Sequence, residues 1–453
     1  MPRIDLPTGL EGSENLPLTR KELRNCFNTG EGIILPRPGI TQLNTTSFAA
    51  RGSFKWNGAL YMVFGNDLVK ITNLATGTNS TIGTIAGSAD IATAVGFNHA
   101  VIVVKGGSLY TLSKTDVLTD ISANANIEPS VAVTHINGRF VYIPSSGDPA
   151  FFSDVGAAGT VQAESFFDAE QLPDLNSTCF NFGNTLYIGG TDSFELFRDV
   201  GASPVPFVRI EGASLRYGFI GALQEHTDTF LFLGREKDQD YGFYAIAPGR
   251  AIKISNSKID EILAGYSLME LANCVPGRLK WRGYDIATFT LARDSFGFMG
   301  GRWFTLDTVV DGISRPWNGG FITELDGKYY TASGKKIGRF DNVNTDFGER
   351  ITRIIDIAFR HPENRRFSVQ SVEIGISQGF NGSVGSVALM MSRNNVNYGP
   401  ALFRQLGAQG KYADKLTWNI PGGLGNYNGF AGLRIYTTQD VSFAADSLFM
   451  NIR

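Results

Sequence analysis

Carboxylates gather in one short stretch of the chain, "ESFFDAEQLPD", which contains Glu164, Asp168, Glu170 and Asp174. A pair of carboxylates can hydrolyse a glycosidic bond when one stays protonated while its partner stays ionised. That chemistry needs two carboxyl groups facing each other across a pocket, and a single acidic loop does not supply such a pair. The stretch is more typical of a solvated loop or of a loop that faces a partner.

Two other motifs resemble catalytic or metal sites but lack part of the required pattern. "GISQG" at 375–379 matches the G-x-S-x-G nucleophile elbow around Ser377, yet the "FNGSVGS" that follows indicates a hairpin and not the required helix. "EKDQDYG" at 236–242 places Asp238 and Asp240 at calcium-loop spacing, without a third oxygen donor or a distal glutamate. We therefore interpret both motifs as turns.

Two polar motifs in the last hundred residues favour structure or contact over catalysis. "SRNNVNYG" at 392–399 resembles the S-x-D-x-G-x-x-W hairpin with Asn394 in place of the aspartate, and asparagines of this kind fix turns. "RHPENRR" places Arg360, Arg365 and Arg366 around a proline turn. Such a cluster is usually solvated loop charge, and the alternative is contact with an acidic partner surface.

Composition excludes several functional classes. The sequence has no Walker A motif and no G-x-G-x-x-G, and its four histidines lie far apart, so it supports neither nucleotide binding nor a local metal motif. We expect no catalytic residue, no cofactor, no metal and no small-molecule substrate. The formal net charge of −3 argues against tight non-specific DNA binding, but it is compatible with DNA sliding past the surface.

The cysteines and apolar runs indicate where the protein is made. Three cysteines without a C-x-x-C motif do not form a disulfide framework, so we expect reduced thiols in a cytosolic product. "MPRIDLPTGLEGSEN" has no apolar segment typical of a secretory signal, and the longest apolar runs are far too short to span a membrane.

A repeat is the strongest internal signal. The 453-residue chain has 12% aromatic residues and 53 glycines, a composition typical of strands joined by turns. Hairpin units such as "WNGALYMVFGNDLVKI" recur roughly every forty residues, which is the spacing of four-stranded propeller blades. The units begin at residues 56, 97, 136, 182, 226, 282 and 324. We predict an all-β protein with a six- or seven-bladed β-propeller over 51–345.

The two ends differ from the repeat. Residues 1–50 are punctuated by Pro and Gly and predict an extended N-terminal arm, with one short helical candidate at 18–26. After about residue 345 the strands become longer, and roughly six strands in a hundred residues fit a small sandwich. We predict a C-terminal β-sandwich-like domain over 346–453.

Two inserts interrupt the propeller repeat. Residues 255–274 predict a helix, with Ile259, Ile262, Leu263, Tyr266 and Met269 on one apolar face and a cap at Ser257. The other insert is "DVGASPVPFVRIEGASLRYG" at 199–218, where prolines stiffen an extended chain segment.

The insert at 199–218 is our candidate contact surface. Pro204 shapes it, and we expect Phe207, Arg209 and Arg216 to project as large side chains of the kinds enriched at interfaces. Arg198 lies at its start. The alternative interpretation is a connection between blades that is packed by its own Phe and Val residues.

The order of these features resembles a known family. A Pro-rich arm ends in "LPRPGI", the fourth unit runs into "SFELFRDVGASPVPFVRIEGASLRYGFIGA", and "SNSKIDEIL" and "RGYDIATFTL" follow. The chain closes on the sandwich-like "GLRIYTTQDVSFAADSLFMNIR". This order is similar to that of the phage stabilisation protein family, the tail hub or nozzle proteins of short-tailed phages, and the resemblance covers most of the chain.

The resemblance implies a structural role in the virion tail, with assembly in the host cytoplasm. It implies a homohexameric ring below the portal and its adaptor, which extends the DNA channel and helps retain the packaged genome. It also implies attachment of a tail needle and of spikes or fibres. DNA would pass through the lumen without sequence-specific contact, and the family has no catalytic residues to carry over.

A second function class stays open at this point. The alternative is a carbohydrate-binding or glycoside-hydrolysing propeller, with the carboxylates of 164–174 as catalytic groups and Trp281 or Trp303 as sugar platforms. It requires a carboxyl pair in a pocket and exposed indole faces. A monomeric propeller scaffold is a third, weaker alternative.

Overall fold

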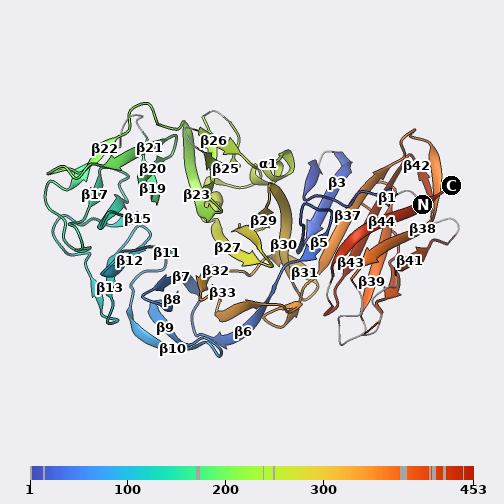
Figure 1. Ribbon diagram of the computed structural model, residues 1–453, viewed down its shortest axis with the longest axis horizontal. Helices are drawn as coiled ribbons and strands as arrows, with labels where there is room; N and C mark the ends of the chain where they lie inside the picture. Colours follow the sequence, from blue (N-terminus) through green and yellow to red (C-terminus); the bar gives the residue numbers. More distant parts are fainter. Residues whose placement is uncertain are drawn as a thin grey trace.

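The chain is built mostly of short strands joined by tight turns, and the propeller class expected from the sequence is confirmed (Figure 1). The computed structural model describes all residues except 1–2, 14–15, 170–173, 238, 248–249, 378–384, 408–409, 411–414, 422–424 and 442. A propeller and a two-sheet sandwich lie side by side along the long axis.

Five separate sheets of the propeller each contain four consecutive antiparallel strands. Blades 1 and 2 are β7 Ala50–Trp56, β8 Ala59–Phe64, β9 Asp67–Asn73, β10 Thr78–Thr84, and β11 Ile91–Val95, β12 His99–Val104, β13 Leu109–Ser113, β14 Leu118–Asp120. Blades 3 and 4 are β15 Ser130–Ile136, β16 Arg139–Pro144, β17 Ala150–Phe152, β18 Phe166–Phe167, and β19 Asn176–Phe182, β20 Thr185–Gly190, β21 Phe194–Asp199, β22 Phe207–Arg209. Blade 5 is β23 Tyr217–His226, β24 Thr229–Glu236, β25 Gly242–Ala247 and β26 Arg250–Lys253.

Two further sets of four strands belong to larger sheets. Blade 6 is β27 Val275–Trp281, β28 Tyr284–Thr290, β29 Ser295–Met299 and β30 Arg302–Val310, and β31 Ile313–Pro316 pairs with the end of β30. Blade 7 is β32 Phe321–Leu325, β33 Lys328–Ser333, β34 Lys336–Asp341 and β6 Gly39–Thr45, beside β35 Thr345–Asp346 and β36 Glu349–Arg350.

The propeller closes with a strand from before the first blade. The first strand of each blade contacts the first strand of the next, and β32 of blade 7 contacts β7 of blade 1. β6 is antiparallel to β34, with Ile40 opposite Phe340, and so supplies the fourth strand of blade 7. The described strands thus form seven blades, and the last one is assembled from chain segments about three hundred residues apart.

Asparagine and glycine set the turns of the blades, as the repeat indicated. Asn57 and Gly58 have φ of 46° and 71°, and Asn137 and Gly138 have φ of 47° and 84°. Two consecutive residues with positive φ match the right-handed twist of a two-residue hairpin, and Asn-Gly adopts this conformation most readily. These turns fix the register of the first hairpin in blades 1 and 3.

The sandwich consists of two sheets, and the first of them continues from blade 6. It runs from β30 through β3 Leu16–Arg24, β37 Arg353–Arg360, β43 Phe430–Thr437 and β39 Ser386–Ser392 to β40 Leu402–Gln405, and β2 Glu11–Ser13 pairs with β3. The second sheet is β4 Cys26–Asn28, β5 Ile34–Pro36, β44 Ala445–Ile452, β38 Arg366–Ile376 and β41 Leu416–Asn419, with β1 Arg3–Ile4 beside β44 and β42 Asn426–Asn428 beside β38. One apolar cluster joins the two sheets through Ile355, Leu433, Val372, Leu448 and Trp418.

The N-terminal segment is extended, and its strands are woven into both parts of the molecule. β3 lies parallel to β30 at Arg24 and antiparallel to β37, so one strand links propeller and sandwich. The helical prediction for 18–26 is wrong. Its Leu, Lys, Glu and Arg residues favour helix only weakly, and pairing on both sides of β3 outweighs that preference.

The insert at 255–274 contains the predicted helical structure, but as two short helices. α1 spans Ser257–Leu263 and α2 spans Leu268–Ala272. The side chain of Asn256, and not Ser257, caps α1 by accepting a hydrogen bond from the backbone of Ile259. Met269 is 76% exposed, so its predicted place on the apolar face is wrong, because the chain turns between the two helices.

Candidate functional site

The insert at 199–218 completes blade 4 and leads to blade 5. β22 pairs with β21, and the backbone N–H of Val200 donates to the carbonyl of Pro206 across the loop between them. The interruption of the repeat is therefore a long connection between the third and fourth strands of one blade. Its end joins β23 at Tyr217.

Phe207 does not project from the insert, so that prediction is wrong. Its side chain is 4% exposed and packs against Phe152 and Phe167, with ring centroids 5.4 Å and 5.2 Å away. β22 turns this side chain inward between blades 3 and 4, because alternate residues of a strand face opposite sides. Phe207 is part of the core that joins these two blades.

Arg209 is held against its own blade. Its Nε lies 2.7 Å from Oε2 of the buried Glu195, and its guanidinium lies 5.7 Å from the ring centre of Phe197. It also donates to the backbone carbonyl of Asp168, in the neighbouring blade. Arg209 therefore binds blades 3 and 4 together, with about a third of its side chain exposed.

Three other predicted contact residues lie on the surface. Arg198, Pro204 and Arg216 are exposed around blade 4. Together they offer two cations and a stiff loop at the rim of the propeller. Their role in an interface stays a prediction.

The arginine cluster of "RHPENRR" lies at the other end of the molecule, on the sandwich (Figure 1). Arg360, Arg365 and Arg366 are exposed, and Arg365 forms an ion pair with Glu363 at 2.9 Å. Arg366 begins β38 opposite Asn428 of β42. The cluster therefore lies apart from the insert at 199–218, and the structure does not bring the two predicted contact sites together within one chain.

The "SRNNVNYG" hairpin forms the turn that the sequence predicts. The carboxamide oxygen of Asn394 accepts hydrogen bonds from the backbone N–H groups of Val396 and Asn397. Asn395, with φ of 58°, donates to the carbonyls of Pro17 and Arg20 and so ties the turn to β3.

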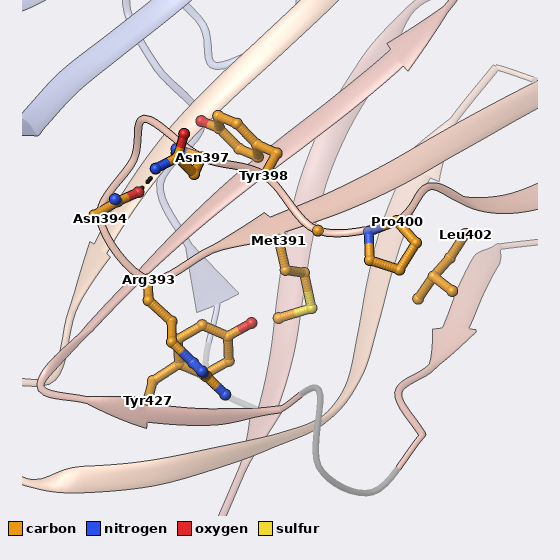
Figure 2. Close-up of a pocket in the computed structure, with 9 residues that line it drawn as sticks. Met391, Arg393, Asn394, Asn397, Tyr398, Pro400, Leu402 and Tyr427 are labelled. Carbon is orange, nitrogen blue, oxygen red and sulfur yellow. Dashed lines mark hydrogen bonds between the residues drawn. The ribbon is translucent and has the colours of Figure 1, made fainter.

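A pocket of about 390 Å³ opens beside this hairpin (Figure 2). Met391 lies between Tyr427 on one side and Pro400 and Leu402 on the other. Arg393, whose Nε donates to the carbonyl of Asn426, lies next to Tyr427 at the rim. The sequence reasoning missed this pocket because its walls come from β39, β40 and β42, which are separate in the chain.

The tyrosines of the pocket are neutral phenols. Burial raises the pKa of Tyr398 and of Tyr427 above the ordinary value of 10.0. The hydroxyl of Tyr398 donates to Asn395, and the guanidinium of Arg434 covers its ring at 4.4 Å. The pocket therefore offers apolar surface, with Arg393 as the cation on its lining.

Buried charges hold the junction between propeller and sandwich. Arg37 makes two bonds to Asp346, at 2.9 Å and 2.5 Å, and Trp317 donates to the same carboxylate. Burial acts to lower the pKa of Arg24, but Glu22 and the nearby Asp307 outweigh burial, so the pKa is raised. Such ion pairs restrict the movement of the propeller relative to the sandwich, since separating them would leave buried charges without a partner.

The residues proposed for glycosidase chemistry do not form a catalytic pair in the described part of the chain. Asp174 accepts bonds from the backbone N–H groups of Asp192 and Ser193, so it fixes a turn. Trp303 is 2% exposed, and its indole N–H donates to Ile254, which removes it as a sugar platform. Glu170 lies outside the described residues.

The other two chemical motifs lie partly outside the described residues. Ser377 follows β38, and its backbone N–H donates to the carbonyl of Ala444, while the rest of its motif, 378–379, lies outside the described residues. Asp238 of the calcium-like motif lies outside the described residues. Among the residues that the structure describes, no group of three His, Cys, Asp or Glu side chains could hold a metal ion. None of the described helices is long and apolar enough to cross a membrane.

Comparison with known proteins identifies the family. A family model described as "Bacteriophage P22 Gp10, beta-propeller" matches residues 13–344. The chain belongs to this family. A curated relative, the tail hub protein gp10 of Salmonella phage P22, is 21% identical over 459 aligned residues that cover 95% of this chain and 93% of the relative. The family resemblance of the sequence is confirmed, and this gp10-family protein is a structural component of a phage tail.

Similar solved structures include other propellers at low identity. The N-terminal domain of Nup159 is 11% identical, with a TM-score of 0.41, and the match covers 74% of this chain and all of that one. An exo-β-1,3-galactanase from Phanerochaete chrysosporium is 11% identical, with a TM-score of 0.31 over 82% of this chain and 97% of that one. These scores are too low to carry an argument about the activity of this gp10-family protein.

Proposed function

We propose that this protein is the tail hub of a short-tailed phage. It assembles as a ring, a homohexamer, below the portal and its adaptor, and it extends the channel through which DNA leaves. It helps to retain the packaged genome and carries further components such as a needle and spikes or fibres. It acts by binding and not by catalysis.

The relationship to a tail hub protein over nearly the full length of both chains carries this proposal. Two features of the chain support it. The formal net charge of −3 leaves little attraction that would slow DNA in a channel. The paired strands and buried charges at the junction make propeller and sandwich one stiff body, which suits a part that bears load.

Electron microscopy of tails tests the proposal. We expect density for this chain between the portal adaptor and the needle, with each subunit position of the ring occupied by one copy of the chain. Light scattering of the purified chain, alone and mixed with portal and adaptor, gives a second measurement. A chain that stays monomeric in both conditions contradicts the ring, and the mixing step matters because some assembly proteins oligomerise only on their template.

A further inference from the structure

The fourth strand of blade 3 exposes an aromatic ring between two carboxylates. Glu164, Phe166 and Asp168 are exposed, while Ser165 and Phe167 between them are buried. Phe166 lies in the edge strand β18, Glu164 lies in the turn before it, and Asp168 directly follows it. We call them the acidic edge.

The acidic edge is exposed in the part of the chain that the structure describes. Phe166 is 48% exposed, although Phe167 next to it packs in the core of blades 3 and 4. In the described part of the chain neither Glu164 nor Asp168 forms an ion pair. Arg209 donates to the backbone carbonyl of Asp168, and its ion pair is with Glu195.

The pocket of Figure 2 has a cation at its rim, whereas the acidic edge carries carboxylates. Met391, Leu402 and Tyr427 give it an apolar interior of a size that accepts an aromatic side chain, and Arg393 lies at its rim. Arg366 precedes Phe367, which lies opposite Tyr427 in the pairing of β38 with β42, so the side chain of Arg366 points to the other face of this strand pair. We call Met391, Arg393, Leu402 and Tyr427 the basic pocket.

Arg393 is the cation on the lining of the basic pocket. Arg360 and Arg365, on the turn that leads to β38, are exposed, and Glu363 neutralises Arg365. The Nε of Arg393 donates to the backbone carbonyl of Asn426. The terminal nitrogens of the guanidinium group are then left toward solvent, where they can bind a carboxylate. An apolar cavity with a cation at its rim fits an aromatic side chain next to a carboxylate.

The two features lie at opposite ends of the molecule, so one chain cannot fill its own pocket. β17, which pairs with β18, is at one end of the long axis, and β42 is at the other (Figure 1). We propose that the acidic edge of one copy docks into the basic pocket of the next copy. Phe166 enters the pocket, and Glu164 and Asp168 face Arg393.

This inference rests on the proposed ring and names the contact that builds it. A ring needs a heterologous interface, in which one patch meets a different patch of the neighbour. An aromatic anchor in a pocket, surrounded by complementary charge, is typical of the few residues that dominate such an interface. The remaining contact area comes from neighbouring surface, since a lasting interface buries about 1,600 Å² in total.

Sedimentation velocity of the full chain, alone and with portal and adaptor, tests the contact. We expect Phe166→Ser and Arg393→Glu each to weaken subunit association by at least about tenfold. Phe48→Ser is the matched control, because Phe48 is 55% exposed on another part of the propeller. Near-ultraviolet circular dichroism should be unchanged in all three variants, since the altered side chains are exposed.

Charge exchange separates a direct contact from an indirect effect. Asp168→Arg alone and Arg393→Glu alone should both weaken the ring, and the two substitutions in one chain should restore it in part. A mixture of Phe166→Ser chains and Arg393→Glu chains keeps one intact contact between unlike copies. That mixture should therefore stop at a two-chain species, which is the signature of a heterologous interface.

The outcomes distinguish this inference from the proposed function. If the wild-type chain forms rings and Phe166→Ser and Arg393→Glu form them equally well, the contact is wrong and the ring stands. If the wild-type chain stays monomeric with portal and adaptor, both fail. A Phe166→Ser variant that loses another tail protein but keeps the ring also overturns the contact.

Discussion

At the residue scale, Phe207 points inward, so a mutation of this residue changes the stability of the propeller. We expect Phe207→Ala to lower the free energy of unfolding by about 3–5 kcal/mol, because it leaves a cavity beside Phe152 and Phe167. Val208→Ala is the control, since Val208 is 41% exposed and should change stability by less than about 0.5 kcal/mol. Urea unfolding measures both. A Phe207→Ala protein of unchanged stability that no longer forms rings would restore the surface role.

A histidine gives a second prediction at this scale. Burial lowers the pKa of His135 from 6.5, where its ring lies 4.9 Å from Phe140. The unfolded chain therefore takes up the proton first, so the contribution of His135 to stability is present above about pH 6.5 and is lost as pH falls through the lower folded pKa. We expect denaturant unfolding of His135→Gln to depend less on pH than that of the wild type between about pH 7.5 and 5. Parallel pH profiles for the two proteins would contradict this.

At the element scale, the N-cap of α1 shows that the spacing of residues in the sequence did not identify the side chain that caps the helix. The sequence places a cap at Ser257, whereas in the structure Asn256 accepts the hydrogen bond of Ile259 and donates to the carbonyl of Leu10. We expect Asn256→Ala to lower the free energy of unfolding by about 1 kcal/mol or more, and Ser257→Ala to change it by only a few tenths. Thermal unfolding of the pair checks this. An equal decrease in the free energy of unfolding in both variants would support Ser257 as a capping residue.

β3 shows how a strand can join two parts of a protein. Its Glu22 and Leu23 lie opposite Asp356 and Ile355 of β37, and its Arg24 lies beside Thr305 of β30. Without β3, blade 6 and the sandwich would each have an open sheet edge at this position. The N-terminal segment therefore stabilises both parts at once.

At the scale of the whole molecule, the boundary near residue 345 stays a prediction, and the strand pairing suggests a test of it. Residues 346–453 alone lack β3, which pairs with β37, and β5, which pairs with β44 and with β4. We expect this fragment to lack a near-ultraviolet circular dichroism signal of fixed tertiary structure, and a version with residues 1–38 joined by a flexible linker to regain it. A fragment that folds alone would show that the N-terminal strands are dispensable for the sandwich.

Much of the fold followed from local sequence. The spacing of the hairpins and their Asn-Gly turns indicate a propeller because strand alternation and positive φ depend on neighbouring residues. The "SRNNVNYG" turn was predictable for the same reason, since Asn394 bonds only to groups within three residues. The order of motifs along the chain was enough to indicate the family.

The candidate site was harder to predict. Phe207 and Arg209 have residue types enriched at interfaces, but the sequence does not say which side of β22 faces the neighbouring blade. The pocket around Met391 and Tyr427 joins strands that are distant in sequence. Nor does the sequence show that Phe367 of β38 lies opposite Tyr427 of β42.

The sequence by itself determined the all-β class, the blade repeat, the turns and the family, because each depends on short-range patterns that survive at low identity. Only the tertiary structure decided that β6 closes blade 7, that β3 links propeller and sandwich, and that Phe207 is core. Alternating apolar residues require a strand to bury one face, but they do not specify which distant strand or blade covers it. That choice is made by packing across the whole molecule.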